Sequence, residues 1–391
     1  MIYDPYSREC QERPFPIYRH FRDEQPCAYN EERDFYALFR FEDIWRATLD
    51  WQTYSSSLGP MLENRDMPGE VMSIIGMDPP RHTRLRNIVS KGFTKRRIGA
   101  LEPELRAIAA NYLDRLVETS ACDIQREFSV KFPMDVISVL LGIPQSERDG
   151  YRESVDRMLE RDPETGLPPQ EGIEGMLRSR DLILELLKAR RERPQDDLIS
   201  LIAHSEYEEP DGSRRQLSDD EVVGFCGLLA AAGAETTAKL IGNCVVYLFQ
   251  HPEQRRLLVD DPLTIPRAIE EILRYDAPSQ FQGRVVLNEV EVHGVRIPKM
   301  ARVAFVTGAA CRDEREFANP DTLDVTRAPS RQLYFGYGQH VCLGMSLARL
   351  EARIALEEIL ARFPQYEVEE RELTRTYQAH VRGFASVPIR F

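Results

Sequence analysis

Most of the chain shows the hydrophobic spacing of amphipathic helices. Between Leu101 and Val117, apolar side chains recur every three or four residues and therefore share one face of a helix. Residues 178–191 and 343–363 follow the same period. Strand patterns are fewer, and they occur at 35–39, in a hairpin over 284–298 that turns at His293-Gly294, and at 381–391. The pattern predicts a mainly α fold with small β sheets.

The longest predicted element is a helix from Asp219 to about Gln250. Ser218 and Glu221 have the S-x-x-E spacing of a capping box, which satisfies free amides at the start of a helix, and Pro252 marks the other end. At 1.5 Å per residue, this helix is roughly 45–50 Å long, enough to cross a domain. Its middle is apolar nearly all round, which predicts a buried helix.

Composition and charge exclude several classes of protein. A hydrophobic fraction of 42% is too high for a disordered chain, and a net charge of −13 disfavours nucleic-acid binding. No uncharged apolar run reaches the roughly 20 residues of a membrane span, and the charged start of the chain is unlike a secretion signal. We therefore expect a single cytoplasmic domain over residues 1–391, with no nucleic-acid partner and no transmembrane segment. Two polar, turn-rich segments, 192–197 and 206–216, predict surface loops.

One cysteine differs from the other six. The seven cysteines are widely spaced, odd in number and without a C-x-x-C pair, which disfavours both a disulfide framework and a structural zinc site. Cys342 lies in 335–344, F-G-Y-G-Q-H-V-C-L-G, directly before a predicted helix. Amides at a helix start stabilise a thiolate. From the residues alone, Cys342 is either a nucleophile or a metal ligand.

This glycine-rich stretch resembles the haem-binding loop of the cytochrome P450 superfamily, F-G-x-G-x-H-x-C-x-G, at every fixed position. The resemblance implies a P450 fold whose long central helix crosses the domain over a haem b cofactor. It implies that Cys342 is the axial thiolate ligand of the haem iron. His340 then reaches a haem propionate, Phe335 packs near the sulfur, and Gly336 and Gly344 border the cofactor. The alternative is an inert cysteine beside a glycine-rich turn.

Two further segments match propionate-binding positions of the superfamily. Residues 78–86, D-P-P-R-H-T-R-L-R, resemble its H-x-x-x-R helix, with His82 and Arg86 four residues apart on one face. Arg284, in G-R-V-V, matches a third contact to the propionates. Two carboxylates buried with a large apolar ring need such cations. Without Cys342, the alternative interpretation of 78–86 is a basic exposed turn.

A structural trio is also expected from the resemblance. Glu271 and Arg274 form the superfamily's E-x-x-R, whose members share one face of a helix. Arg327 matches the third member. The implied role is structural, because the trio stabilises the core on the haem side. A lone E-x-x-R is more often a pair of solvated surface charges.

The middle of the central helix carries A-G-A-E-T-T at residues 232–237. Glycine inside a helix costs about 1 kcal/mol relative to alanine, and a threonine hydroxyl can bend a helix, so the residues alone predict a local kink. The resemblance implies an oxygen-binding groove in which Thr236 hydrogen-bonds the bound O2 and Glu235 relays protons from water. Ala232 leaves room above the iron.

The resemblance implies a monooxygenase that inserts one oxygen atom of O2 into a steroid, fatty acid, terpenoid or macrolide. Electrons come from NAD(P)H through a separate ferredoxin reductase and ferredoxin. The alternatives are a peroxide-driven oxidation and a non-catalytic haem-based sensor or binding protein. We expect a mobile lid over 149–178. Pocket candidates, each also consistent with plain core, are Met61, Leu62, Met72, Ile74, Leu228, Leu229, Ala232, Phe281 and Val381.

Charges near the loop suggest where a ferredoxin binds. A positive face there would suit an acidic partner, although ordinary solvated charges are an equal alternative. The basic residues concerned are Lys91, Lys95, Arg96, Arg97, Arg331, Arg349 and Arg353. The chain also departs from the superfamily pattern at three positions, with Met300 in place of glycine, Cys311 in place of asparagine and Gln332 in place of histidine.

Overall fold

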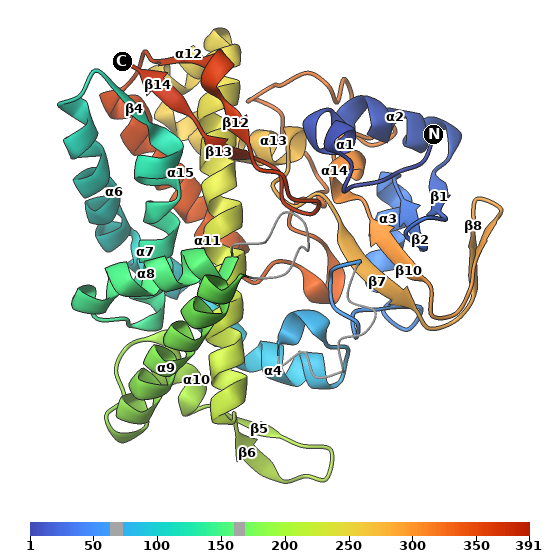
Figure 1. Cartoon of the computed structure of the whole chain (residues 1–391), viewed down its shortest axis with the longest axis horizontal. Coiled ribbons are helices and arrows are strands. Elements are labelled where there is room, and N and C mark those ends of the chain that lie inside the picture. The colour runs from blue at the N-terminus through green and yellow to red at the C-terminus, as the bar shows by residue number, and fades with distance from the viewer. Residues whose placement is uncertain (63–72, 160–168) are drawn as a thin grey trace.

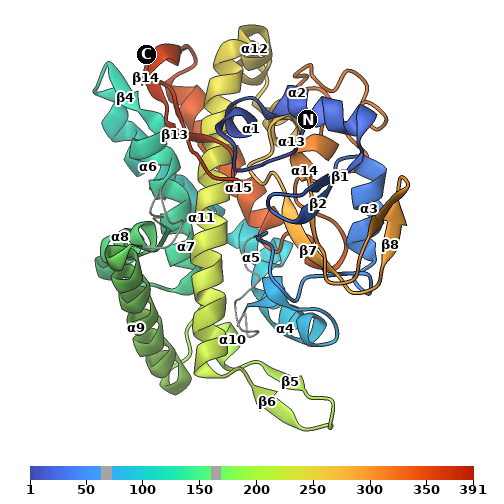
Figure 2. The ribbon, with the colours of Figure 1, turned by 45° about the vertical axis from the view of Figure 1, so that its right-hand side comes forward.

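The helix α11 (Asp219–Gln250) crosses the whole molecule (Figures 1 and 2) and confirms the prediction at both ends. The Ser218 hydroxyl accepts from the Glu221 amide at 3.2 Å, and the Glu221 carboxylate accepts from the Ser218 amide at 2.9 Å. Every residue from 237 to 248 is buried. The structure is a computed structural model that describes residues 1–62, 73–159 and 169–391.

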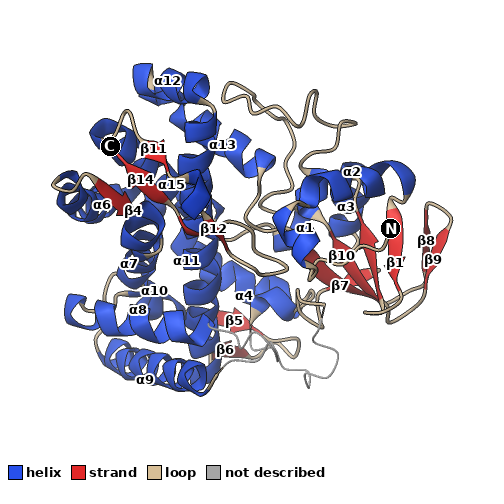
Figure 3. Ribbon diagram, turned by 45° about the horizontal axis from the view of Figure 1, so that its top comes forward, coloured by secondary structure: helices blue, strands red, loops and turns tan. Residues whose placement is uncertain are grey.

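Long helices gather on one side of α11, as Figure 3 shows. They are α6 (Glu102–Val117), α7 (Lys131–Leu141), α8 (Gln145–Leu159), α9 (Gln170–Glu192) and α15 (Met345–Arg362). The apolar spacing predicts three of them, α6, α9 and α15, to within a few residues except at the start of α9. The shorter helices are α1 (Arg8–Glu12), α2 (Pro14–Glu24), α3 (Phe41–Leu49), α4 (Arg81–Val89), α5 (Lys95–Ala100), α10 (Leu198–Ala203), α12 (Pro252–Asp260), α13 (Ile265–Tyr275) and α14 (Thr307–Ala310).

The main sheet lies on the opposite side of α11 (Figure 3). Its order is β1 (Cys27–Asn30), β2 (Phe35–Leu38), β10 (Arg302–Phe305), β7 (Gln282–Val286) and β3 (Tyr54–Ser55). The β2–β10 pair is parallel and the others are antiparallel. Smaller sheets join β4 (Ala121–Asp123), β14 (Pro388–Arg390) and β11 (Glu367–Val368), and β12 (Thr374–Arg375) with β13 (Phe384–Ser386). A mainly α fold with small sheets is confirmed.

Two local predictions were wrong in part. Residues up to Val286 belong to the main sheet, so the hairpin consists of β8 (Val290–Val292) and β9 (Val295–Ile297), with its turn at His293-Gly294 as expected. The expected loop 206–216 is an exposed hairpin of β5 (Glu206–Glu208) and β6 (Arg214–Gln216). Tyr207 lies opposite Arg215, whose guanidinium lies 4.7 Å from the tyrosine ring centroid. Such cross-strand pairs stabilise a polar hairpin that a hydrophobic pattern does not reveal.

The turn before β10 explains why the superfamily often has glycine where this chain has Met300. Met300 has φ +68°, in the left-handed region that favours glycine. A side chain there costs roughly 1–2 kcal/mol, so methionine is tolerated at this exposed turn rather than favoured.

None of the helices in the described ranges has both the length and the apolar composition that crossing a membrane requires.

Candidate functional site

The loop that carries Cys342 is held by short-range hydrogen bonds. The Cys342 amide donates to the Phe335 carbonyl at 2.8 Å. The Gln332 side chain accepts from the Phe335 amide at 3.0 Å and donates to the Gly336 carbonyl at 3.5 Å. Gln332, where the superfamily often has histidine, therefore fixes the start of the loop through its amide group.

Two glycines shape this loop. Gly336 and Gly338 have φ +69° and +70°, which glycine adopts without strain. At Gly338 a Cβ would lie 2.7 Å from the Thr48 carbonyl oxygen, so the close contact with α3 also requires glycine. Beside it, the Tyr337 and Trp45 rings stack with centroids 3.5 Å apart. The outer face of the loop is thus packed against α3.

The inner face of the loop presents the cysteine sulfur. Cys342 is exposed to solvent, whereas the other six cysteines, all free, are buried or half-buried. Burial of the sulfur among protein atoms nevertheless raises the pKa of the thiol, opposed by the amides of Gly344 and Met345 and by the charges of Arg86 and Arg349. A side chain that is both crowded by protein and accessible borders an interior space. This arrangement suits a ligand to a large bound group.

Four basic side chains converge beside the loop. His82 and Arg86 come from α4, Arg284 from β7 and His340 from the short helix Gly338–His340. The His82 and His340 rings lie 4.2 Å apart, and the Arg86 guanidinium donates to the Val341 carbonyl. The structure therefore brings together all four residues that the sequence predicts for propionate binding.

Burial and mutual repulsion disfavour the charged forms of this basic cluster. Burial and the charge of Arg86 lower the pKa of His82 to about 4, while burial lowers the pKa of Arg284 to about 10. The pKa of His340 falls far below its usual range through burial and the charge of Arg284. Asp78 is the carboxylate that opposes these shifts at His82 and Arg284.

Several polar atoms of this cluster lack partners. Within the described ranges, neither ring nitrogen of His82 nor Nε2 of His340 has a hydrogen-bond partner. An unsatisfied buried polar group costs about 1–3 kcal/mol. A group that brings two carboxylates beside Cys342 satisfies this cluster in both charge and hydrogen bonding, and the propionates of haem meet that description.

The residues expected to form an oxygen groove lie at the middle of α11. The Thr236 hydroxyl donates to the Ala232 carbonyl at 2.8 Å, and Thr237 donates to Gly233 at 3.0 Å. Ala232 is exposed although it lies at the centre of a buried helix. A Cβ on Gly233 would lie 2.9 Å from Ile137 of α7, so close helix packing is a sufficient reason for this glycine. The helix runs without a break through this segment.

The expected structural trio is assembled, with Glu271 and Arg274 buried and Arg327 half-buried. Arg274 donates to both carboxylate oxygens of Glu271, at 2.7 and 2.8 Å, and Arg327 lies 3.1 Å from the same carboxylate. Arg274 also donates to the carbonyls of Cys311 and Pro320 at 3.0 and 2.8 Å. Because Cys311 contributes only its backbone, cysteine replaces asparagine there without loss of the contact.

Pocket candidates occupy different environments. Leu228 is half-buried on α11. The expected proton relay, Glu235, is half-buried beside Thr236 on the same helix. Val381 bridges Ser279, which places the C-terminal turn against the segment before β7. Buried candidates are Ile74, Leu229, Leu62 and Phe281, the last fully buried in the cluster under the N-terminal helices. Met72 and residues 160–168 of the expected lid lie outside the described residues.

Most of the expected positive face is neutralised. Arg97 pairs with Asp196, Arg331 with Glu42 and Glu316, Arg349 with Glu270, and Arg353 with Glu102. Lys91, Lys95 and Arg96 are exposed and have no ion pair to a described residue. The free positive charge near the loop is therefore concentrated on the segment that leads into α5.

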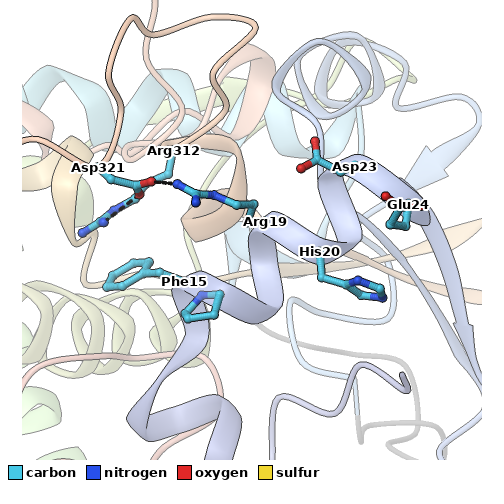
Figure 4. A pocket seen from close by; sticks show the side chains of 8 residues that line it. Phe15, Arg19, His20, Asp23, Glu24, Arg312 and Asp321 are labelled. Atoms are coloured by element: carbon cyan, nitrogen blue, oxygen red, sulfur yellow. Dashed lines mark hydrogen bonds and ion pairs between the residues drawn. The ribbon is translucent and has the colours of Figure 1, made fainter.

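A cavity lined by other residues lies beside the N-terminal helix α2 (Figure 4). It has a volume of about 520 Å³ and lies between α2 and the segment that carries Arg312 and Asp321. Arg19 and Arg312 both pair with Asp321, and the Arg312 guanidinium lies 3.6 Å from the Phe15 ring centroid. Because these charges satisfy one another, this cavity is not the candidate active site.

Sequence reasoning missed one notable polar residue of α11. Lys239 is buried one turn after Glu235. A lysine inside an otherwise apolar helix was the available signal.

Comparisons with known proteins agree with this geometry. Residues 263–389 match the family model Cytochrome P450. The chain is 40% identical over 397 residues to cytochrome P450 123 of Mycobacterium tuberculosis, covering 100% of the chain and 96% of that protein. It is 36% identical to vitamin D(3) 25-hydroxylase of Pseudonocardia autotrophica, covering 99% and 96%. The structure matches CYP109E1 from Bacillus megaterium in complex with corticosterone at TM-score 0.88, with 30% identity over 98% of this chain and 99% of that one.

The fold and the shared sequence define a haem-dependent class of oxidoreductase. Identity of this extent over the whole chain shows that the protein belongs to the cytochrome P450 family. It is a monooxygenase enzyme of that family, and the family implies a haem cofactor.

Proposed function

We propose that the protein uses haem b and O2 to insert one oxygen atom into a hydrophobic small molecule. The observation that carries this proposal is the cluster beside Cys342 formed by the buried His82 and Arg284 and the half-buried Arg86 and His340. Its two guanidinium groups and its unpaired ring nitrogens suit the carboxylates of haem as ion-pair and hydrogen-bond partners.

Each side chain of the site has a distinct role in this proposal. Haem bound here supplies a thiolate-ligated iron that activates O2. Cys342 provides the sulfur ligand, and the amides of Gly344 and Met345 stabilise its negative charge. Arg86 and Arg284 pair with the propionates. Phe335, below the Arg349 guanidinium at 4.8 Å, covers the loop near the sulfur.

The central helix leaves room for O2 and carries the side chains that transfer protons. Ala232 offers a small, accessible surface. The Thr236 hydroxyl proton is engaged by the Ala232 carbonyl, so the Thr236 oxygen is left as a hydrogen-bond acceptor. Glu235, half-buried next to it, transfers protons between water and the groove.

The electron donor is a separate protein in this proposal. NAD(P)H reduces a ferredoxin reductase, which reduces an acidic ferredoxin. The exposed, unpaired cations Lys91, Lys95 and Arg96 support a docking position near α5. The other expected cations form salt bridges within the protein, so their charges are not available to a ferredoxin.

The substrate class is tested by titrating the ferric, haem-loaded protein with steroids, fatty acids, terpenes and macrolides. Steroids come first, because one relative is a vitamin D(3) hydroxylase and one structural neighbour was solved with corticosterone. We expect a saturable shift of haem absorption with one class, as the ligand displaces water from the iron. A response to none of the four classes would contradict the proposed substrate range.

A further inference from the structure

The exposed hairpin of β5 and β6 projects from the fold at one end of α11 and lies against α4 (Figures 1 and 2). Among the residues of its two strands, Tyr207 alone is buried. One aromatic side chain therefore anchors a hairpin whose other strand residues are polar or charged.

Ion pairs join this hairpin to α4 and to the start of α11. Arg215 donates to Glu209 at 2.7 Å and to both carboxylate oxygens of Glu221 at 2.8 and 2.9 Å. The same two carboxylates face α4, because Glu209 lies 3.6 Å from Arg84 and Glu221 lies 3.8 Å from Arg81. These five residues, the hairpin network, connect three elements of the fold.

Glu221 is the buried member of the hairpin network. It is 5% exposed, and its carboxylate also accepts from the Ser218 amide in the capping box. Burial raises the pKa of Glu221, but Arg215, the Ser218 amide and Arg81 outweigh burial and hold the pKa below its usual range. The charged carboxylate therefore holds the hairpin and the start of α11 together through charge-assisted hydrogen bonds.

The helix α4 carries the hairpin network on one face and the candidates for propionate binding on another. Residues three or four apart share a face of a helix, so Arg81 lies on the same face as Arg84. His82 and Arg86 lie together on a different face, where the Arg86 guanidinium donates to the Val341 carbonyl of the cysteine loop. Because α4 has only nine residues, a contact that fixes one face also fixes the other.

We propose that the hairpin of β5 and β6 positions α4 for haem binding. Glu209 is the positioning residue, because it holds Arg84 on the outer face of the helix whose inner face carries His82 and Arg86. This inference rests on the role proposed above for these two side chains in binding the propionates.

The test measures how fast the ferric, haem-loaded protein loses haem to an excess of apomyoglobin. Glu209→Gln removes the charge that faces Arg84 and keeps a side chain of the same size. We expect haem transfer to accelerate by about threefold, the scale of one half-exposed ion pair. Amide exchange of residues 81–89 should accelerate as well, because α4 opens more readily without this contact.

Glu208→Gln is the matched control. It removes the same charge from the same strand, at an exposed position that has no ion pair to a described residue. Haem transfer and amide exchange of α4 in this variant should equal those of the parent.

A double variant shows whether the effect passes through Arg84. Arg84→Gln alone should accelerate haem transfer about as much as Glu209→Gln, and the two changes together should do no more than either alone, because both remove one contact. Additive effects would place the action of Glu209 elsewhere and overturn the proposal. A parent rate of haem transfer in Glu209→Gln would also overturn it.

Arg86→Gln distinguishes this inference from the function on which it rests. We expect this variant to lose haem at least about tenfold faster, because it removes a charge-assisted bond to a propionate. If Arg86→Gln leaves the rate unchanged, the role of α4 in haem binding is wrong. If Arg86→Gln accelerates haem transfer but Glu209→Gln does not, only the role of the hairpin is wrong.

Discussion

The two adjacent threonines of α11 form the same backbone hydrogen bond but face different surroundings. Thr236 and Thr237 each donate to the carbonyl four residues earlier. Thr237 is 3% exposed, whereas Thr236 is half-buried in the accessible part of the helix near Ala232. The surroundings of each hydroxyl, and not its local bond, therefore support the role proposed for Thr236 over one for Thr237.

Replacing Thr236 by alanine removes the acceptor that the proposal places near O2. We expect Thr236→Ala to consume electrons but to yield at least about tenfold less product per electron, with hydrogen peroxide released instead. The measurement is product and peroxide per NAD(P)H oxidised. Thr237→Ala is the matched control, because it loses the same type of hydrogen bond outside the groove. Unchanged product yield in Thr236→Ala would show that the hydroxyl has no part in oxygen activation.

The candidate site was predictable where it is encoded in a continuous motif. The 335–344 loop and the E-x-x-R pair are local in sequence, and the structure assembles both. The convergence of Arg284 with His82 depends on tertiary structure, so only the resemblance to a family predicted it. Lys239 escaped notice because its partner, the Phe384 carbonyl, lies 145 positions further along the chain.

At the scale of elements, Glu271 connects α13 to the long loop that precedes the cysteine motif. Its carboxylate binds Arg274 and Arg327, and it also accepts from the Asp324 amide at 3.0 Å. Arg274 in turn donates to several carbonyls of that loop, including Pro320. The loop has few strands or helices of its own, so these buried contacts determine its course.

Removing the negative charge of Glu271 leaves the buried Arg274 guanidinium without its counter-ion. We expect Glu271→Gln to reduce the free energy of unfolding by about 3–5 kcal/mol, the usual cost of breaking a buried ion pair. The measurement is urea denaturation followed by circular dichroism. Asp260→Asn breaks the exposed pair with Arg256 on α12 and should leave the midpoint unchanged. Similar midpoints for the two variants would refute the structural role of Glu271.

Elements were predicted best where burial makes the hydrophobic pattern strong. The capping box and the apolar middle of α11 predicted both of its ends. The hairpin of β5 and β6 was missed because most of its side chains are exposed and polar. Such strands show no alternation of apolar and polar residues from which they could be predicted. Similarly, the end of β7 was predicted to belong to a local hairpin. Its observed partners are β10, which follows that hairpin in the sequence, and β3, which is too short to show a strand pattern.

At the scale of the whole molecule, an acidic chain keeps basic groups in its interior. The net charge is −13, yet the cluster around His82 and Arg284 has an excess of positive charge. Burying such a cluster is unfavourable unless an anion accompanies it. If the propionates of haem lie at this cluster as proposed, they supply that anion, and the stability of the haem-free protein should be sensitive to pH.

The haem-free protein should lose stability on acidification through His82. Burial holds the pKa of this histidine at about 4 in the folded protein, compared with about 6.5 in an unfolded chain. Between these values the unfolded state binds more protons, so the free energy of unfolding falls as the pH falls from 6.5 towards 4. We expect the parent to lose about 1.6 kcal/mol more than His82→Asn between pH 6.5 and 5.

Urea denaturation of both haem-free proteins at several pH values measures this difference. Haem should reduce it, because the propionates stabilise a protonated His82 in the folded state and so raise its pKa. The haem-loaded parent is therefore the control, and its stability should depend less on pH through this window than that of the haem-free parent. If His82→Asn and the parent lose stability in parallel without haem, His82 is not an uncompensated buried base, and the assignment of the cluster to the propionates loses its main physical support.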